Sequence, residues 1–214
     1  MDNINEGHIV EYIRNLVPEK SQLKDLEAYA VKNHIPIVEP EVAQLLRVLI
    51  KMQRPRNILE VGTAIGYSAI VMAKNTGEDT RITSIERRKD MVQLARENID
   101  KYQFNNKIRV IEGDAAEILP SIEENYDFIF LDAAKGQYMD FFNEAIRLLK
   151  AGGIIVSDNV LFKGMVSSDK LVIRRKKTIV KRLRSFLKYI NQIDGFTSSI
   201  IPIGDGLAIT YREV

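Results

Sequence analysis

The chain has 214 residues, of which 45% are hydrophobic, so it is long enough to bury a substantial core and short enough to form a single domain. It contains no cysteine, which excludes disulfides, cysteine-bound zinc and a thiolate nucleophile, and it has only two histidines, His8 and His34. Any metal site must therefore consist mainly of oxygen ligands. The sequence shows neither a basic, apolar leader nor a run of about 18 apolar residues. We expect a cytoplasmic protein that does not bind a membrane.

Three helices are expected before the first strand. The residue pattern predicts helices over residues 5–16, over 21–33 with Ser21 as the N-cap, and over 40–53 with Pro40 in the first turn. Because these helices precede every strand, we expect residues 1–55 to form a helical cap. Residues 56–214 would form the core of the same domain.

From residue 57 onward, short apolar runs alternate with amphipathic helical stretches. The runs are NILEV, RITSIE, KIRVIEG, YDFIFLD and GGIIVSDN. This alternation predicts an α/β fold with a mostly parallel sheet that helices cover on both faces. Two further runs, SSIIPI and GLAITYR, flank Gly204, Asp205 and Gly206, which predicts a tight turn between two antiparallel strands at the C-terminus.

A glycine-containing loop follows the first predicted strand, in the string EVGTAIGYS from Glu60 to Ser68. Gly62 and Gly66 would let the backbone turn sharply and approach a ligand, and the start of the next helix favours negative charge. The spacing departs from the dinucleotide motif G-x-G-x-x-G, because Ala64 replaces the glycine that admits a pyrophosphate. The loop therefore favours a nucleoside ligand without a diphosphate, although a single glycine-rich turn is more often only a turn.

Acidic residues end the next two predicted strands. Glu86 lies about 24 residues after Gly62, where Rossmann-type sites place an acid that binds ribose hydroxyls. Asp114 follows the third strand and could accept a hydrogen bond from an adenine amino group. Either acid could instead cap the following helix. With the glycine loop, three consecutive strand ends in register predict a ligand site at the carboxyl edge of the sheet.

Oxygen-bearing side chains also follow the fourth and fifth predicted strands. Asp132 ends the fourth strand, and Asp158 and Asn159 end the fifth. Since these strands should be neighbours, two carboxylates and one amide oxygen would converge, which suits a hard cation such as Mg²⁺. An Asx turn at Asp158 is the alternative interpretation. Lys135, three residues after Asp132, is by itself more typical of a solvated loop residue.

Four strings resemble the class I S-adenosylmethionine (SAM)-dependent methyltransferases, and within them the metal-dependent O-methyltransferases of the catechol and caffeoyl-CoA type. They are IPIVEP, ILEVGTAIGYS, LDAAKGQY and SDN, and the resemblance extends from about residue 35 to the C-terminus. It implies a Rossmann-like, seven-stranded, mostly parallel sheet and a homodimer. It also implies SAM as cofactor, a divalent cation such as Mg²⁺ on Asp132, Asp158 and Asn159, and catalytic roles for Lys135 and Asp132. The implied cofactor-binding residues are Val38, Gly62, Thr63, Gly66, Ser68, Glu86, Asp114, Ala115 and Asp132.

Methyl transfer is an in-line displacement at a sulfonium methyl group, so the acceptor oxygen must be deprotonated and held close to the methyl carbon. A metal that binds the acceptor hydroxyl lowers its pKa and fixes its position, and a nearby lysine can take the proton. We therefore expect Lys135 to be the base. Positioning and charge stabilisation should supply the larger share of catalysis.

Positive charge is concentrated near the C-terminal end of a chain whose formal net charge is only +2. Residues 161–190 contain ten basic residues and one acid, Asp169, so this segment carries +9 and the rest of the chain −7. The basic residues are Lys163, Lys170, Arg174, Arg175, Lys176, Lys177, Lys181, Arg182, Arg184 and Lys188. On a helix, Lys177, Lys181, Arg184 and Lys188 share one face, with apolar residues on the other. This stripe indicates an anionic partner, and we expect nucleic acid.

This basic insert resembles the bacterial branch of tRNA 5-hydroxyuridine methyltransferases, which form 5-methoxyuridine at the wobble position. The resemblance implies that the tRNA anticodon loop is the partner, with Arg174, Arg175, Lys176, Lys177, Lys181 and Arg182 as RNA-binding residues. A wobble base lies in a single-stranded loop and can enter a pocket while basic side chains hold the phosphates.

Four other interpretations stay open. The enzyme could methylate small catechol-type molecules, with the insert holding an anionic carrier such as a CoA thioester. The basic helix could be only a solvated covering of the sheet, or it could bind an acidic membrane surface. The chain could also be a cofactor-binding or RNA-binding module without catalysis.

Overall fold

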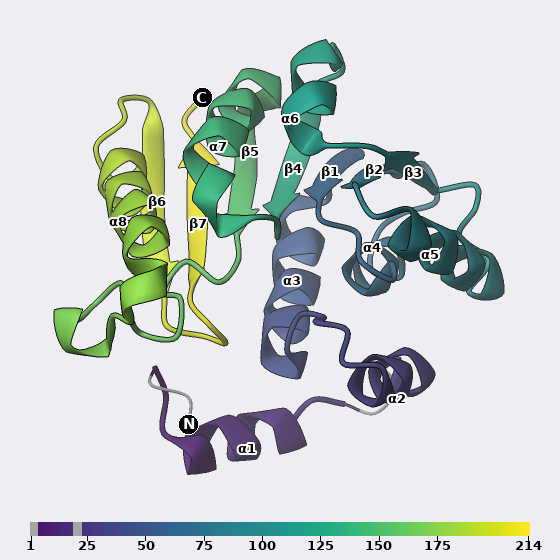
Figure 1. The fold of residues 1–214 in the computed structure, drawn as a ribbon. Helices are drawn as coiled ribbons and strands as arrows, with labels where there is room; N and C mark the ends of the chain where they lie inside the picture. The colour runs from purple at the N-terminus through teal and green to yellow at the C-terminus, as the bar shows by residue number, and fades with distance from the viewer. Residues whose placement is uncertain (1–3, 19–22) are drawn as a thin grey trace.

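Seven strands form one mixed sheet in the computed structural model, which describes residues 4–18 and 23–214 (Figure 1). The strand order is β3-β2-β1-β4-β5-β7-β6. The strands are β1 (Asn57–Val61), β2 (Arg81–Glu86), β3 (Ile108–Glu112), β4 (Tyr126–Leu131), β5 (Leu149–Ser157), β6 (Phe196–Ile201) and β7 (Leu207–Arg212). The expected seven-stranded, Rossmann-like α/β fold is confirmed.

Strands β1 to β5 pair in parallel, and β7 runs antiparallel to both β5 and β6. The C-terminal hairpin is therefore as expected, but its connection spans residues 202–206, since Ile201 pairs with Leu207. Strand β5 begins at Leu149, earlier than the run GGIIVSDN indicates. Glycines are poor strand formers, so the sequence pattern missed the start of this strand.

Eight α-helices are found in the described residues. They are α1 (Gly7–Asn15), α2 (Lys24–Lys32), α3 (Pro40–Gln53), α4 (Tyr67–Ala73), α5 (Lys89–Lys101), α6 (Ala115–Ile118), α7 (Tyr138–Leu148) and α8 (Lys177–Ile190). The third helix begins and ends where the sequence predicts. The expected N-cap of the second helix, Ser21, lies outside the described residues. None of the helices in the described part of the chain is long and apolar enough to cross a membrane.

Helices cover both faces of the sheet, and alternate residues of the central strands fill the two cores. On β4, Phe128 and Phe130 face a core formed with α3, α4 and α5, whereas Ile129 and Leu131 face a core formed with α7 and α8. This alternation follows from the two-residue period of a strand. Helices α1 and α2 lie beyond the sheet (Figure 1). Helix α3, which we expected in the cap, instead packs into the first core through its buried apolar side chains Val42, Leu46 and Ile50.

Candidate active site

The carboxyl ends of the central parallel strands align at one edge of the sheet. Backbone N–H groups just beyond each strand donate to the neighbouring strand: Gly62 to Ile85 O at 2.9 Å, Asp132 to Val61 O at 2.9 Å, and Asp158 to Leu131 O at 2.9 Å. The sheet hydrogen bonds thus continue for one residue past the strands. This continuation fixes Gly62, Asp132 and Asp158 side by side, as the sequence predicts.

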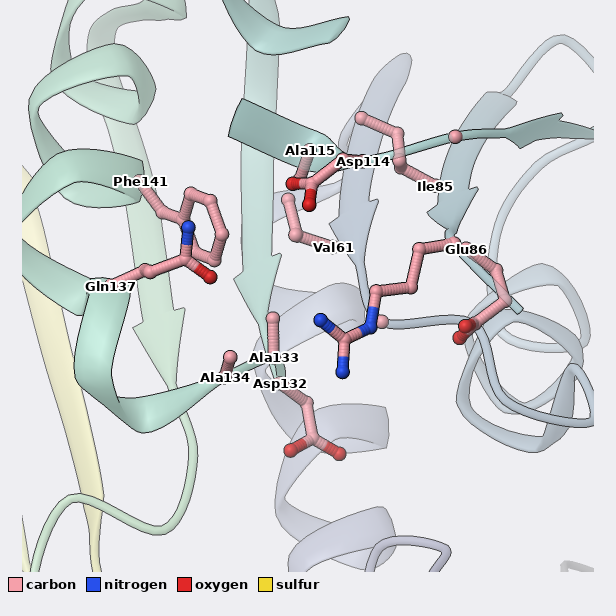
Figure 2. A pocket seen from close by; sticks show the side chains of 13 residues that line it. Val61, Ile85, Glu86, Asp114, Ala115, Asp132, Ala133, Ala134, Gln137 and Phe141 are labelled. Carbon is pink, nitrogen blue, oxygen red and sulfur yellow. The ribbon is translucent and has the colours of Figure 1, made fainter. Parts of the chain in front are cut away.

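A cavity of about 190 Å³, called here the cofactor cavity, lies at this edge. Its lining residues are Val61, Gly62, Ile85, Glu86, Arg87, Gly113, Asp114, Ala115, Asp132, Ala133, Ala134, Gln137 and Phe141. In Figure 2, Asp114 and Asp132 lie at opposite ends of the cavity, with Glu86 on one side and Phe141 on the other. Apolar walls with carboxylates at the rim suit a flat nucleoside whose polar groups lie at its ends.

The two strand-end acids are held by backbone N–H groups. Glu86 accepts hydrogen bonds from Ala64 N at 3.0 Å and from Arg88 N at 2.8 Å. Ala64 has φ 44°, a left-handed conformation that is uncommon for a residue with a side chain, and its N–H thereby points at Glu86. Asp114 caps α6 by accepting from Ala116 N at 2.9 Å. Asp114 therefore both caps a helix and lines the cavity.

Gly62 is required by the approach of two loops. It has φ +103°, and a Cβ atom at this position would lie 2.0 Å from the carbonyl oxygen of Asp132. Any side chain at Gly62 would therefore push the loop after β1 away from Asp132, the residue that follows β4. The sequence predicts a glycine that brings the backbone close to a ligand, but here the close neighbour is the chain itself.

A buried carboxylate, Glu60, lies beneath the glycine loop. It accepts hydrogen bonds from the hydroxyl groups of Ser68, at 2.5 Å, and Ser84. The hydroxyl of Ser84 also bonds that of Thr63. Burial raises the pKa of Glu60 to about 7, against the lowering effect of the two serine hydroxyls. Glu60 thus links β1, β2 and α4 below the cavity.

Four of the expected cofactor residues do not line the cavity. Val38, Thr63, Gly66 and Ser68 line neither the cofactor cavity nor the larger cavity described next, and their cofactor roles stay predictions. Gly66 turns the chain into α4, with φ +84°. The other expected cofactor residues all line the cofactor cavity.

A second cavity, of about 580 Å³, adjoins the first and is called here the acceptor cavity. It brings together Asp132, Lys135, Asp158 and Asn159, the four residues to which the sequence assigns metal binding and catalysis. Lys135 Nζ lies 3.3 Å from Asp132 Oδ1. Residues of α2, the loop after it and the start of α3 close the cavity, among them Tyr29, His34 and Glu39.

Asp158 is almost completely buried, with 1% of its surface exposed. Burial, and then the negative charge of Asp132, raise its pKa well above the ordinary value. Its backbone carbonyl accepts a hydrogen bond from Tyr138 Oη at 2.6 Å, which fixes the end of β5. Asn159 follows with φ 55°. Two adjacent carboxylates with one lysine leave negative charge in excess, which a divalent cation would balance.

The donor set fits a hard cation. Two carboxylates and an amide oxygen in one cavity are ligands that Mg²⁺ accepts while keeping positions for water or substrate. Within residues 4–18 and 23–214, no group of three or more His, Cys, Asp and Glu side chains gathers as a metal site. The third donor here would be Asn159, so the fit depends on an amide oxygen.

Sequence reasoning missed the apolar walls of the cofactor cavity and the anchor of β5. Gln137 lines the cofactor cavity from the 3₁₀ turn before α7, and Phe141 lines it from the first turn of α7. The hydroxyl of Tyr138 donates to the backbone carbonyls of Leu131 and Asp158 and so holds the ends of β4 and β5. Their position at the end of LDAAKGQ and in the four residues after it was a usable signal. The amphipathic pattern of α7, however, does not separate a cavity wall from core packing.

The basic segment begins as a 3₁₀ turn (Arg174–Lys176) and continues as α8. Arg174, Arg175, Lys177, Lys181 and Arg182 are exposed. Arg184 is different, because it donates to Val166 O at 2.9 Å and to Asp169 Oδ1 at 2.7 Å. We expected Arg184 on the charged stripe, but it instead fastens the loop that precedes the basic segment.

The acceptor cavity and the basic segment are connected through one hollow, called here the basic hollow. Lys135 lines both the acceptor cavity and this hollow, whose other lining residues include Thr178, Lys181 and Arg182. Arg182 Nη1 donates to Gly136 O at 3.0 Å, directly beside Lys135. The cationic surface therefore reaches the rim of the candidate active site.

The fold and the adjoining cavities define a class I methyltransferase. A family model described as O-methyltransferase matches residues 14–213, and the chain belongs to this family. Caffeoyl-CoA O-methyltransferase 1 of Arabidopsis thaliana is 32% identical over 206 residues, which cover 91% of this chain and 79% of that protein. A catechol O-methyltransferase of Niastella koreensis is 35% identical over 62% of each chain.

Comparison with solved structures leads to the same family. The O-methyltransferase of Bacillus cereus in complex with SAH has a TM-score of 0.85 and 28% identity, covering 96% of this chain and 97% of that one. Together, the family match, the shared fold and the cofactor cavity show that the protein is a SAM-dependent O-methyltransferase.

Proposed function

We propose that the enzyme transfers a methyl group from SAM to the 5-hydroxyl of 5-hydroxyuridine at the wobble position of tRNA, with Mg²⁺ or another divalent cation. One observation carries the proposal: the cavity that holds Asp132, Lys135, Asp158 and Asn159 is joined through Lys135 to an exposed, strongly basic surface. A tRNA acceptor would also place the protein in the cytoplasm.

Asp132, Asp158 and Asn159 would hold the cation. When bound, it would lower the pKa of an acceptor hydroxyl and restrict its position. The 5-hydroxyl of the base is acidic and enol-like, and the adjacent O4 carbonyl gives it a second oxygen, as in a catechol. The three side chains would therefore orient a pair of neighbouring oxygens toward the cofactor cavity.

Lys135 would accept the proton of the acceptor hydroxyl. Its Nζ lies 3.3 Å from Asp132 Oδ1, so the carboxylate would stabilise the ammonium that forms. The acceptor oxygen then forms a bond with the methyl carbon while the bond from carbon to sulfur breaks, leaving S-adenosylhomocysteine. Asp132 lines both cavities and would align the two reactants across this step.

The exposed cations of the basic segment would hold the RNA. They are Arg174, Arg175, Lys177, Lys181 and Arg182, together with Lys176, which is half-buried. Basic side chains that contact phosphates give affinity that falls as salt rises. An anticodon loop is single-stranded, so its wobble base can leave the stack and enter the acceptor cavity.

A small catechol-type acceptor is the second candidate, and the comparisons favour it. The relatives reported above are named as caffeoyl-CoA and catechol O-methyltransferases. In that case the basic segment would hold an anionic carrier, such as the phosphates of a CoA thioester. A vicinal diphenol would present the same oxygen pair to Asp132, Asp158 and Asn159.

Methyl transfer from labelled SAM to separate acceptors tests the proposal. The acceptors are tRNA carrying 5-hydroxyuridine, the same tRNA with unmodified uridine, and catechol, each with Mg²⁺ and with chelator. We expect labelling of the first tRNA alone, lost with chelator and strongly reduced when Arg174, Arg175, Lys176 and Lys177 are changed to Ala. Labelling of catechol alone, unaffected by these four changes, would contradict the tRNA proposal and support the second candidate.

We also propose a homodimer. Helix α1 buries none of its residues, and large apolar side chains are exposed on it and at its C-cap, among them Tyr12 at 66% and the C-cap residue Leu16 at 63%. A second copy of the chain could cover this face. Light scattering after size-exclusion chromatography should give twice the mass of one chain and a monomer for Tyr12→Ser with Leu16→Ser. A monomeric wild-type protein would contradict the proposal.

A further inference from the structure

The carboxylate of Glu39 lines the acceptor cavity. It belongs neither to the proposed cation ligands nor to the proposed proton transfer. Glu39 is the N-cap residue of α3, a position where a side chain usually accepts a hydrogen bond from the first turn. The Glu39 side chain makes no such bond. It lines the acceptor cavity together with Asp158 and Asn159.

The surroundings of Glu39 hold its carboxylate in place without neutralising it. A Cβ atom at Gly204 would lie 3.2 Å from Glu39 Oε2, so the turn between β6 and β7 packs closely against the carboxylate. Arg14, whose charge lowers the pKa of Glu39, is engaged in a two-pronged pair with Glu41, at 2.7 and 2.9 Å. Within the described residues, no other side chain donates a hydrogen bond to the Glu39 carboxylate.

The electrostatics agree with this geometry. Burial is the largest influence on Glu39 and raises the pKa of its carboxyl group, and Glu41 and Asp205 add to the rise, while a hydrogen bond from its own backbone and the charge of Arg14 oppose it. Glu39 in turn is one of the charges that raise the pKa of Asp158. A partly desolvated acceptor beside the reacting groups is costly, and a donor on the substrate would offset that cost.

The proposed acceptor carries such a donor. In 5-hydroxyuridine, the 5-hydroxyl, the O4 carbonyl and the N3–H group occupy three consecutive positions of the ring. If the two oxygens face Asp132, Asp158 and Asn159, the N3–H group lies next to them on the same ring edge. A catechol has only a C–H group at the corresponding position, so it offers nothing for a carboxylate to accept.

We propose that Glu39 determines acceptor specificity by accepting a hydrogen bond from the N3–H group of the uracil ring. This inference rests on the proposed tRNA function. It assigns Glu39 to recognition of the base, distinct from the metal set, the base Lys135 and the phosphate-binding cations. A site built to bond an N–H group rejects analogues that lack it, because its own polar group is then left without a partner.

The test pairs a change in the protein with a change in the substrate. Wild type, Glu39→Gln and Glu39→Ala are compared on an anticodon stem–loop RNA that carries either 5-hydroxyuridine or N3-methyl-5-hydroxyuridine, and on catechol. The readouts are kcat/KM and, by fluorescence anisotropy with SAH present, the Kd of each RNA. Glu78→Ala, an exposed carboxylate away from both cavities, is the matched control. Thermal unfolding verifies that each variant folds.

We expect wild type to prefer the N3–H substrate over the N3-methyl substrate by on the order of 10- to 100-fold, the range for a hydrogen bond to a charged group. Glu39→Ala should lose most of this preference, and Glu39→Gln should keep part of it because its amide oxygen still accepts. Catechol offers no N–H group to Glu39, so a change in its methylation reports only the effect of the lost charge on Asp158. A purely structural role at the α3 N-terminus would instead affect all acceptors equally.

The outcomes separate this inference from the proposed function. If wild type methylates the 5-hydroxyuridine RNA but Glu39→Ala keeps the full preference for N3–H, the role of Glu39 is overturned while the tRNA function stands. If wild type neither methylates nor binds that RNA, the tRNA function fails, and the role of Glu39 fails with it.

Discussion

The two cavities at the carboxyl edge differ in how their acidic groups are balanced. In the cofactor cavity, backbone N–H groups already bond Glu86 and Asp114. In the acceptor cavity, Lys135 pairs with Asp132, and Arg88, which also lines it, is paired with Asp90, so neither is bonded to Asp158 or Glu39. The cofactor side is therefore preorganised by the chain itself, whereas on the acceptor side the proposed cation and the substrate would supply the missing partners. Removing a charge should accordingly have opposite consequences for activity and stability on the acceptor side.

Asp158→Asn should have the largest effect on activity. Loss of one carboxylate of the proposed cation site should lower kcat by on the order of 10³-fold, since metal stabilisation contributes several kcal/mol. The metal-free variant should unfold at the same or a higher temperature, because a buried negative charge beside Asp132 has been removed. Thermal unfolding with and without Mg²⁺ should show stabilisation by the cation in wild type only. Asp79→Asn, at an exposed position, is the control. Stabilisation by Mg²⁺ that persists in Asp158→Asn would argue against the proposed cation site at Asp158.

Lys135→Ala should lower kcat by on the order of 10²-fold or more, the usual contribution of a general base. SAM affinity should stay within about twofold, because Lys135 lines the acceptor cavity and not the cofactor cavity. Methyl-transfer assays at saturating substrate measure kcat, and isothermal titration calorimetry measures SAM affinity. Lys74→Ala, at the exposed C-cap residue of α4, is the matched control. An unchanged kcat would remove the role of Lys135 as the base.

Glu60→Gln tests the buried carboxylate beneath the cofactor cavity through the pH dependence of the free energy of unfolding. Because the pKa of Glu60 is raised to about 7 in the folded protein, protonated Glu60 stabilises the fold. This contribution is fully present below the unfolded-state pKa of about 4.5 and is lost as the pH rises through about 7, a change of about 3 kcal/mol. Chemical unfolding between pH 5 and 8 should therefore show wild type losing stability relative to Glu60→Gln. Parallel pH profiles would mean that the carboxylate is ionised throughout.

Two neighbouring cations of α8 should separate RNA binding from loop anchoring. Lys181→Ala should weaken tRNA binding a few-fold and reduce the slope of log Kd against log salt by about one, with stability unchanged. Arg184→Ala should instead lower the free energy of unfolding by about 1 to 2 kcal/mol, because it loses bonds to Val166 O and Asp169. The salt slope of Arg184→Ala should match wild type. Equal slopes for Lys181→Ala and wild type would exclude a phosphate contact at Lys181.

The sequence predicts those features that depend on local pattern. The alternation of strands and helices, the third helix and the convergence of Asp132, Asp158 and Asn159 follow from periodicity and from the geometry of parallel strands. Features that depend on the packing of distant segments were not accessible. The position of α3 in the core, the anchoring role of Arg184 and the entry of Glu39 into the acceptor cavity all depend on which surface a helix meets. No spacing within the chain specifies that choice.

A competition reaction tests the central claim most directly. Wild-type enzyme, Mg²⁺ and limiting labelled SAM are mixed with equal concentrations of 5-hydroxyuridine tRNA and catechol at about 0.1 M salt, and the label in each product is counted. If the basic surface and the acceptor cavity act together, nearly all of the label should appear in the tRNA as 5-methoxyuridine. Label found predominantly in the catechol ether would contradict the account and identify a small-molecule enzyme.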